Sequence, residues 1–129
     1  MKNLMISAIA FFALSSAFAQ SAAIEGNWGG QQQVNGFTFD VTFAISKNSV
    51  TLTNLCTGAG TTATAQVTSA TTYTDSTISF LEAKQDVKSN GPLTCNVQTQ
   101  IISLNYNIQG NSLTFTQAGS PQSLVLQRK

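Results

Sequence analysis

The sequence has no histidine and few charged side chains. Asp, Glu, Lys and Arg together make up 9% of its 129 residues, against the roughly 25% that is usual in soluble proteins. Without histidine there is no Ser-His-Asp or Cys-His catalytic group and no imidazole metal ligand. Two cysteines are too few for a four-thiolate zinc site. The formal net charge of +1 provides no basic surface for nucleic acid. We therefore expect no metal, no cofactor and no nucleic-acid partner.

The first 19 residues have the pattern of a secretory signal peptide. A short positive start precedes an apolar run over residues 4–14, and Ala17-Phe18-Ala19 supplies the small residues that a signal peptidase reads. We expect cleavage before Gln20, with cleavage after Ala23 as the alternative. The apolar run is shorter than the ~20 residues that span a bilayer, so no membrane span is expected. With no cysteine near the cleavage site to carry a lipid, the expected mature chain, 20–129, is periplasmic or secreted and has a net charge of zero.

Cys56 and Cys95 are the only thiols in the chain. Because exported proteins meet an oxidising compartment, we expect the two cysteines to form a disulfide. Closing a loop of this length stabilises a fold by about 4 kcal/mol in the chain-entropy model. Two separate free thiols are the alternative, but the sequence has no C-x-x-C motif that would favour a redox role.

Apolar residues alternate with polar ones along much of the chain. Residues 37–46 are apolar at every odd position, which is typical of a half-buried strand. Asn35-Gly36 and Lys47-Asn48 on either side resemble tight hairpin turns. The apolar parity shifts between Ile101 and Ile102, which predicts a bulge or bend there. Further strands are expected at 25–34, 50–56, 61–69, 77–83, 93–109, 112–117 and 122–128.

These strands predict an all-β fold. About eight short strands in a single domain, 20–129, are typical of a small antiparallel barrel or sandwich. We favour a single up-and-down barrel because closure leaves no exposed edge strand, and we expect it to be a monomer. The segment 82–88 has no apolar stripe, so we interpret it as a charged loop or surface patch, or as one turn of helix.

The two ends of the predicted domain resemble a known family. Gly26-Asn27-Trp28 opens the first strand and Leu124-Val125-Leu126-Gln127-Arg128 closes the last. This pattern is similar to the lipocalin-like group of the calycin superfamily, whose members carry Gly-x-Trp near the N-terminus and an Arg near the C-terminus. The resemblance implies that Trp28 plugs the closed end of an eight-stranded barrel and that Arg128 lies across its indole. A cation–π contact is a physical reason for an Arg at this apolar parity.

Several aromatic residues are expected at inward-facing positions. They either line a cup for a small apolar ligand or fill the interior, because side chains alone can fill a small eight-stranded barrel. The mature chain is short and has no long loop after its first strand, which favours a filled interior, whereas the family resemblance favours a cup with its mouth opposite Trp28. The candidate lining residues are Phe37, Phe39, Phe43, Phe80, Tyr106 and Phe115.

Two functions are compatible with such a barrel. The first is binding of a small hydrophobic ligand in or at the mouth of the barrel. The second is inhibition of a secreted protease, because the chain also resembles bacterial inhibitors of secreted metalloproteases, in which residues equivalent to 20–23 enter the protease cleft. Catalysis is not expected, since Glu25 and Asp40, the nearest carboxylate pair, fall at outward-facing positions and no nucleophile or phosphate-binding motif is present.

Overall fold

The structure is a computed structural model that describes residues 24–129. The predicted signal peptide and the segment 20–23 lie outside the described residues. The described chain is all-β, and no helix in it is long and apolar enough to cross a membrane. Its strands are β1 (Gly26–Val34), β2 (Phe37–Ile45), β3 (Ser49–Gly58), β4 (Thr61–Tyr73), β5 (Thr77–Phe80), β6 (Lys84–Asn90), β7 (Leu93–Thr99), β8 (Ile102–Gln109), β9 (Ser112–Thr116) and β10 (Ser123–Arg128).

Eight of these strands form a closed antiparallel barrel. The order around the barrel is β1-β10-β9-β8-β5-β4-β3-β2, while β6 and β7 pair only with each other. The predicted fold class is therefore confirmed, including the disulfide between Cys56 and Cys95. The unexpected feature is the β6–β7 hairpin, which leaves the barrel after β5 and returns to it at β8.

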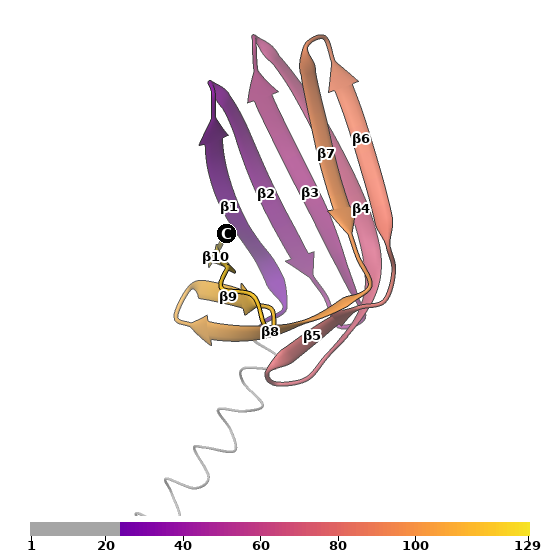
Figure 1. Cartoon of the computed structure of the whole chain (residues 1–129), viewed down its shortest axis with the longest axis vertical. Coiled ribbons are helices and arrows are strands. Elements are labelled where there is room, and N and C mark those ends of the chain that lie inside the picture. Colours follow the sequence, from indigo (N-terminus) through magenta and orange to yellow (C-terminus); the bar gives the residue numbers. More distant parts are fainter. Residues whose placement is uncertain (1–23) are drawn as a thin grey trace, which may run out of the picture.

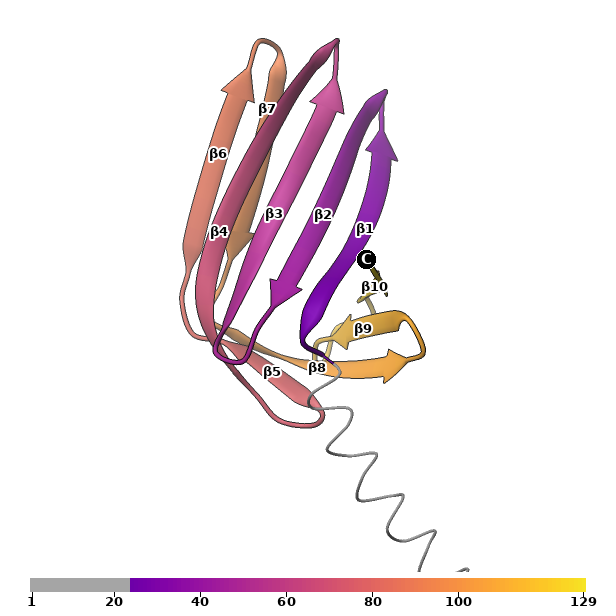
Figure 2. The same cartoon turned by 180° about the vertical axis from the view of Figure 1, so that it is seen from behind.

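The barrel is taller on one side than on the other. Strands β1 to β4 form a tall curved sheet, and β5, β8, β9 and β10 lie across its lower end (Figure 1; Figure 2). The β6–β7 hairpin stands beside the upper part of this sheet and contacts β3 and β4. Strands β1 and β2 lie toward the other edge of this sheet from the hairpin. The hairpin therefore leaves their upper part uncovered, and the candidate site lies there.

Alternation of apolar and polar residues produces the strands, as the sequence predicts. In β3 and β4 every second side chain is buried, and in β7 Leu93, Cys95, Val97 and Thr99 are buried while the residues between them are exposed. The turn between β1 and β2 is formed by Asn35 and Gly36, both with positive φ, as the tight turn that matches strand twist requires.

Residues 82–88 differ from the predicted loop or helical turn, whereas the bend predicted within 93–109 is present. Residues 84–90 form strand β6 and are neither a helical turn nor a loop. Their alternation is weak because charged and amide side chains, rather than apolar ones, hold this strand in place. The predicted break near Ile101 is present: β7 ends at Thr99, β8 begins at Ile102, and Ile101 is 73% exposed between them.

Candidate functional site

Trp28 and Arg128 meet at the lower end of the barrel. The pairing of β1 with β10 places them opposite each other. The Arg128 Cζ lies 4.1 Å from the centroid of the Trp28 ring. The indole is fully buried and its Nε1 donates a hydrogen bond of 2.8 Å to the carbonyl oxygen of Ile24. The indole is thus held from both sides, by a backbone acceptor and by a guanidinium.

Gly26 makes room for this arrangement. Its φ is +124°, a conformation that side chains disfavour, and a Cβ atom there would lie 3.0 Å from Arg128 Nη1. The same guanidinium nitrogen donates to the carbonyl oxygen of Glu25 at 3.4 Å. The glycine of the Gly-x-Trp pattern therefore has a physical role, because it lets the arginine reach both the backbone and the indole.

Lys129 joins strands β10 and β2 on the outside of the barrel. Lys129 crosses over Gly29, where a Cβ would collide with the lysine side chain. Its Nζ lies 3.0 Å from Asp40 Oδ1 and donates to Thr42 Oγ1 at 2.6 Å, both on β2. Lys129 thereby ties the end of β10 across β1 to β2, and Asp40 has a structural partner. These contacts of Lys129 are not predicted by the sequence analysis.

An apolar hollow opens between β1, β2 and β10. Its volume is about 410 Å³. In the register of β1 with β2, Phe43 pairs with Trp28 and Phe39 pairs with Gln32, so the hollow extends along β2 away from the Trp28 end of the barrel. The lining residues are Gly30, Gln31, Gln32, Phe39, Val41, Phe43, Leu52, Leu124, Val125 and Leu126.

Two further hollows adjoin the first, and we call the three together the mouth groove. A hollow of about 200 Å³ shares Phe43 and Leu52 with it and reaches β5, β8 and the end of β7. Another, of about 350 Å³, shares Leu124 with it and reaches the β9–β10 loop. The additional lining residues are Phe80, Gln98, Thr99, Gln100, Ile102 and Leu104 in the second hollow, and Leu104, Phe115, Thr116, Gln117, Ser120, Gln122 and Ser123 in the third.

Four of the six aromatic residues expected to line a ligand site do line the mouth groove. They are Phe39, Phe43, Phe80 and Phe115. The other two have structural contacts elsewhere. The ring of Phe37 occupies the space where a Cβ at Gly58 would stand, and the Tyr106 hydroxyl donates to the carbonyl oxygen of Thr74. Alternation along the strands predicts an inward face for all six residues but does not separate the two sets.

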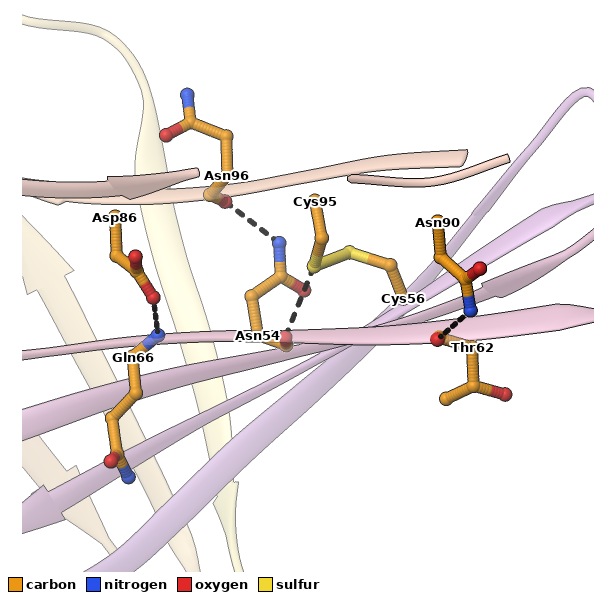
Figure 3. Close-up of a disulfide and its surroundings, with 8 residues drawn as sticks. All are labelled: Asn54, Cys56, Thr62, Gln66, Asp86, Asn90, Cys95 and Asn96. Carbon is orange, nitrogen blue, oxygen red and sulfur yellow. Dashed lines mark hydrogen bonds between the residues drawn. A yellow bond between two sulfur atoms is a disulfide. The ribbon is translucent and has the colours of Figure 1, made fainter. Parts of the chain in front are cut away.

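The disulfide ties the β6–β7 hairpin to the sheet of the barrel. Cys56 on β3 and Cys95 on β7 are both fully buried, and the bond between them joins the hairpin to the sheet (Figure 3). Beside it, the Asn54 side chain donates from Nδ2 to the carbonyl oxygen of Asn96 at 2.9 Å. The hairpin is thus tied to the inner face of β3, while Phe39 and Val41 on β2 stay only partly buried.

Side chains of the β6 segment cap the free edge of β4. Glu82 Oε1 accepts from the Ala70 amide at 2.7 Å and Asp86 Oδ2 accepts from the Gln66 amide at 2.8 Å. Asn90 Nδ2 donates to the carbonyl oxygen of Thr62 at 2.9 Å, and Figure 3 shows the last two of these bonds. Backbone groups that β5 does not reach are satisfied in this way, which protects an edge from pairing with other chains.

This cap lowers the pKa of both carboxyl groups. For Glu82 the main cause is the hydrogen bond from the Ala70 amide, which favours the ionised form. For Asp86 the pKa is lowered first by Lys88, whose Nζ lies 2.8 Å away, and then by the Gln66 amide. Sequence reasoning treated these charges as a surface patch. The regular spacing of acceptor and donor side chains at 82, 86 and 90 was the signal that it overlooked.

Two tyrosine hydroxyls are also engaged in structural contacts. The Tyr73 hydroxyl donates to Glu25 Oε1 at 2.9 Å, and burial together with this carboxylate raises the pKa of Tyr73 to about 12. Burial, with a smaller effect of Asp75, raises the pKa of Tyr106 to about 12. Glu25 and Asp40 thus contact different partners and do not form a pair. Within residues 24–129, no three His, Cys, Asp or Glu side chains gather in a group that would hold a metal ion.

Comparisons of the chain with protein-family models, with curated proteins and with solved structures find no match. The closed eight-stranded antiparallel barrel is compatible with a calycin-like fold. The function must therefore be inferred from the barrel and its mouth groove.

Proposed function

We propose that this protein is an exported, lipocalin-like barrel that binds a small hydrophobic ligand in its mouth groove. The observation that carries the proposal is the apolar hollow of about 410 Å³ between β1, β2 and β10. Sites for small molecules are concave, mostly apolar and roughly 300–1,000 Å³ in volume. The hollow has this size and this character.

The energetics of the groove support a ligand. Phe39 and Val41 are only partly buried, and Leu124 at the rim is 46% exposed. Each Å² of apolar surface removed from water contributes roughly 25 cal/mol to binding. A ligand that covers these side chains completes a face that the β6–β7 hairpin covers only over β3 and β4.

The ends of the barrel support the lipocalin-like assignment. Gly26, Trp28 and Arg128 have the contacts that the family pattern implies, with the guanidinium over the buried indole. The hollow extends from Phe43 away from this end. We propose that the protein acts as a monomer in the periplasm or outside the cell, and that its role is not catalytic. The protease-inhibitor alternative depends on residues 20–23, which lie outside the described residues.

A fluorescent probe tests the proposal. N-phenyl-1-naphthylamine, which is neutral and fluoresces in apolar surroundings, is titrated with the folded protein. We expect saturable enhancement with one site per chain. Val41→Asp places an unpaired charge in the hollow and should abolish the enhancement, because burying such a charge is costly. Val87→Asp is the matched control, since Val87 is 50% exposed on β6 and outside the groove. No enhancement with the wild type, or equal binding by both variants, would refute the proposal.

A further inference from the structure

The mouth groove carries no charge. Among the residues that line its three hollows, none is Asp, Glu, Lys or Arg. The nearest strands do have charges, but these are used elsewhere. Lys129 and Asp40 pair on the outer face of the barrel, and Arg128 lies over Trp28. A separate hollow on the outer face, lined by Asp40, Arg128 and Lys129, shares Gly30 and Gln31 with the groove. A ligand on the inner side of β1 and β2 therefore meets no cation.

The polar side chains of the groove are all neutral: hydroxyls and amides line the hollow at the β9–β10 loop, and amides stand at two further places. Gln32 stands at the β1 end, and Gln98 and Gln100 stand at the end of β7. The side-chain amides of these three glutamines have no hydrogen-bond partner among residues 24–129, whereas the neighbouring Thr99 hydroxyl donates to the carbonyl oxygen of Glu82. A primary amide can both donate and accept a hydrogen bond. Both ends of the groove thus offer neutral donors and acceptors around an apolar floor formed by Phe43 and Leu52.

We infer that the ligand is an uncharged amphiphile: an elongated apolar body with a neutral hydrogen-bonding group such as a hydroxyl, an amide or an ester. This inference rests on the proposed function and names the ligand class of the same groove. A carboxylate loses its hydration when it enters an apolar site and needs a cation to compensate. Because the groove supplies none, an ionised fatty acid is disfavoured relative to the alcohol or amide of the same chain length.

The test compares ligands that differ only in their head group. Decan-1-ol, decanamide and decanoate compete for N-phenyl-1-naphthylamine bound to the wild-type protein at pH 7.5, where decanoate is ionised. We expect the alcohol and the amide to displace the probe, with decanoate weaker by about tenfold or more, a factor that corresponds to roughly 1.4 kcal/mol. Equal displacement by decanoate and decan-1-ol would overturn the inference while leaving the proposed function intact. Failure of the probe itself to bind would overturn the proposed function, and the inference with it.

A charge-gain variant tests the physical reason. Gln32→Lys places a cation at the β1 end of the groove, and we expect it to strengthen decanoate binding about tenfold while leaving decan-1-ol binding within a factor of about two. Gln33→Lys is the matched control, because Gln33 is the next residue of β1, faces the opposite side of the sheet and does not line the groove. The inference is wrong if both variants bind decanoate as the wild type does, or if Gln33→Lys gains as much as Gln32→Lys.

Discussion

The guanidinium of Arg128 lies over the indole of Trp28, with Cζ 4.1 Å from the ring centroid, and so joins the last strand of the barrel to the first. Trp28 is the only tryptophan in the chain, so tryptophan emission reports on the surroundings of this one side chain. The pair lies where β1 begins and β10 ends, and the mouth groove extends along β2 from Phe43 away from it.

Replacing the guanidinium of Arg128 should lower the stability of the fold. Arg128→Ala is expected to lower the free energy of unfolding by roughly 0.5–2 kcal/mol, the range of cation–π contacts, and to change the emission of Trp28. Arg128→Lys keeps the charge and should recover part of the loss. Urea unfolding followed by Trp28 fluorescence measures both variants. An unchanged midpoint and an unchanged spectrum in Arg128→Ala would contradict the contact.

Reducing the disulfide should loosen the hairpin. Cys56 and Cys95 are 39 positions apart, and a bridge of this span contributes about 4 kcal/mol in the chain-entropy model. We expect dithiothreitol, or the double variant Cys56→Ser/Cys95→Ser, to lower the urea midpoint and to increase hydrogen exchange in β6 and β7 more than in β1 and β2. Equal exchange in all four strands would show that the bridge does not anchor the hairpin.

The edge cap on β4 makes stability sensitive to acid. The pKa of Glu82 and that of Asp86 are lowered in the folded protein, so their stabilising contribution is present above the usual carboxyl range and is lost as pH falls through the folded values. Glu82→Gln/Asp86→Asn should therefore flatten the fall in unfolding free energy below about pH 4.5. Asn90→Ala is the control, because its amide does not titrate and its effect should be equal at pH 4 and pH 7. An identical acid slope in wild type and double variant would refute the cap.

Alkaline pH should act through the two tyrosines. The pKa of Tyr73 and that of Tyr106 are each raised to about 12, from a usual 10.0. Because the folded state holds these protons more tightly, the stability they contribute is present below about pH 10 and is lost as pH rises towards 12. Absorbance at 295 nm should show tyrosinate forming near pH 12 in the folded protein, with Tyr73→Phe isolating Tyr106. Titration near pH 10 with the circular dichroism unchanged would contradict the burial of Tyr106 and the partial burial of Tyr73.

The alternation of side chains predicted most of the barrel. Strand β2 and the last strand follow from period-two patterns, although most of their side chains stay at least partly exposed. Asn35-Gly36 is typical of a tight hairpin turn. The sequence could not show that β5 pairs with β8. The number of strands does not specify which strands pair. The β6–β7 hairpin lies outside the barrel because it packs on β3 and β4, which are distant from it in the sequence.

The candidate site could be predicted only in part. Parity placed Phe39 and Phe37 on the same face, but a residue lines a groove only where nothing else covers it. Phe37 is packed over Gly58, far along the chain, and Phe39 remains open because the hairpin stands over β3 and β4. Which part of an inward face stays uncovered is a property of the assembled fold.

The position of a bound ligand decides whether the mouth groove is the binding site. Isotope-filtered NOE spectroscopy detects contacts between unlabelled decan-1-ol and the labelled protein. If the ligand binds in the mouth groove, we expect NOEs to Phe39, Val41 and Phe43 at its floor and to Leu124 at its rim. NOEs confined to exposed side chains outside the groove, such as Val87 or Ile101, or the absence of any NOE at saturating alcohol, would contradict it.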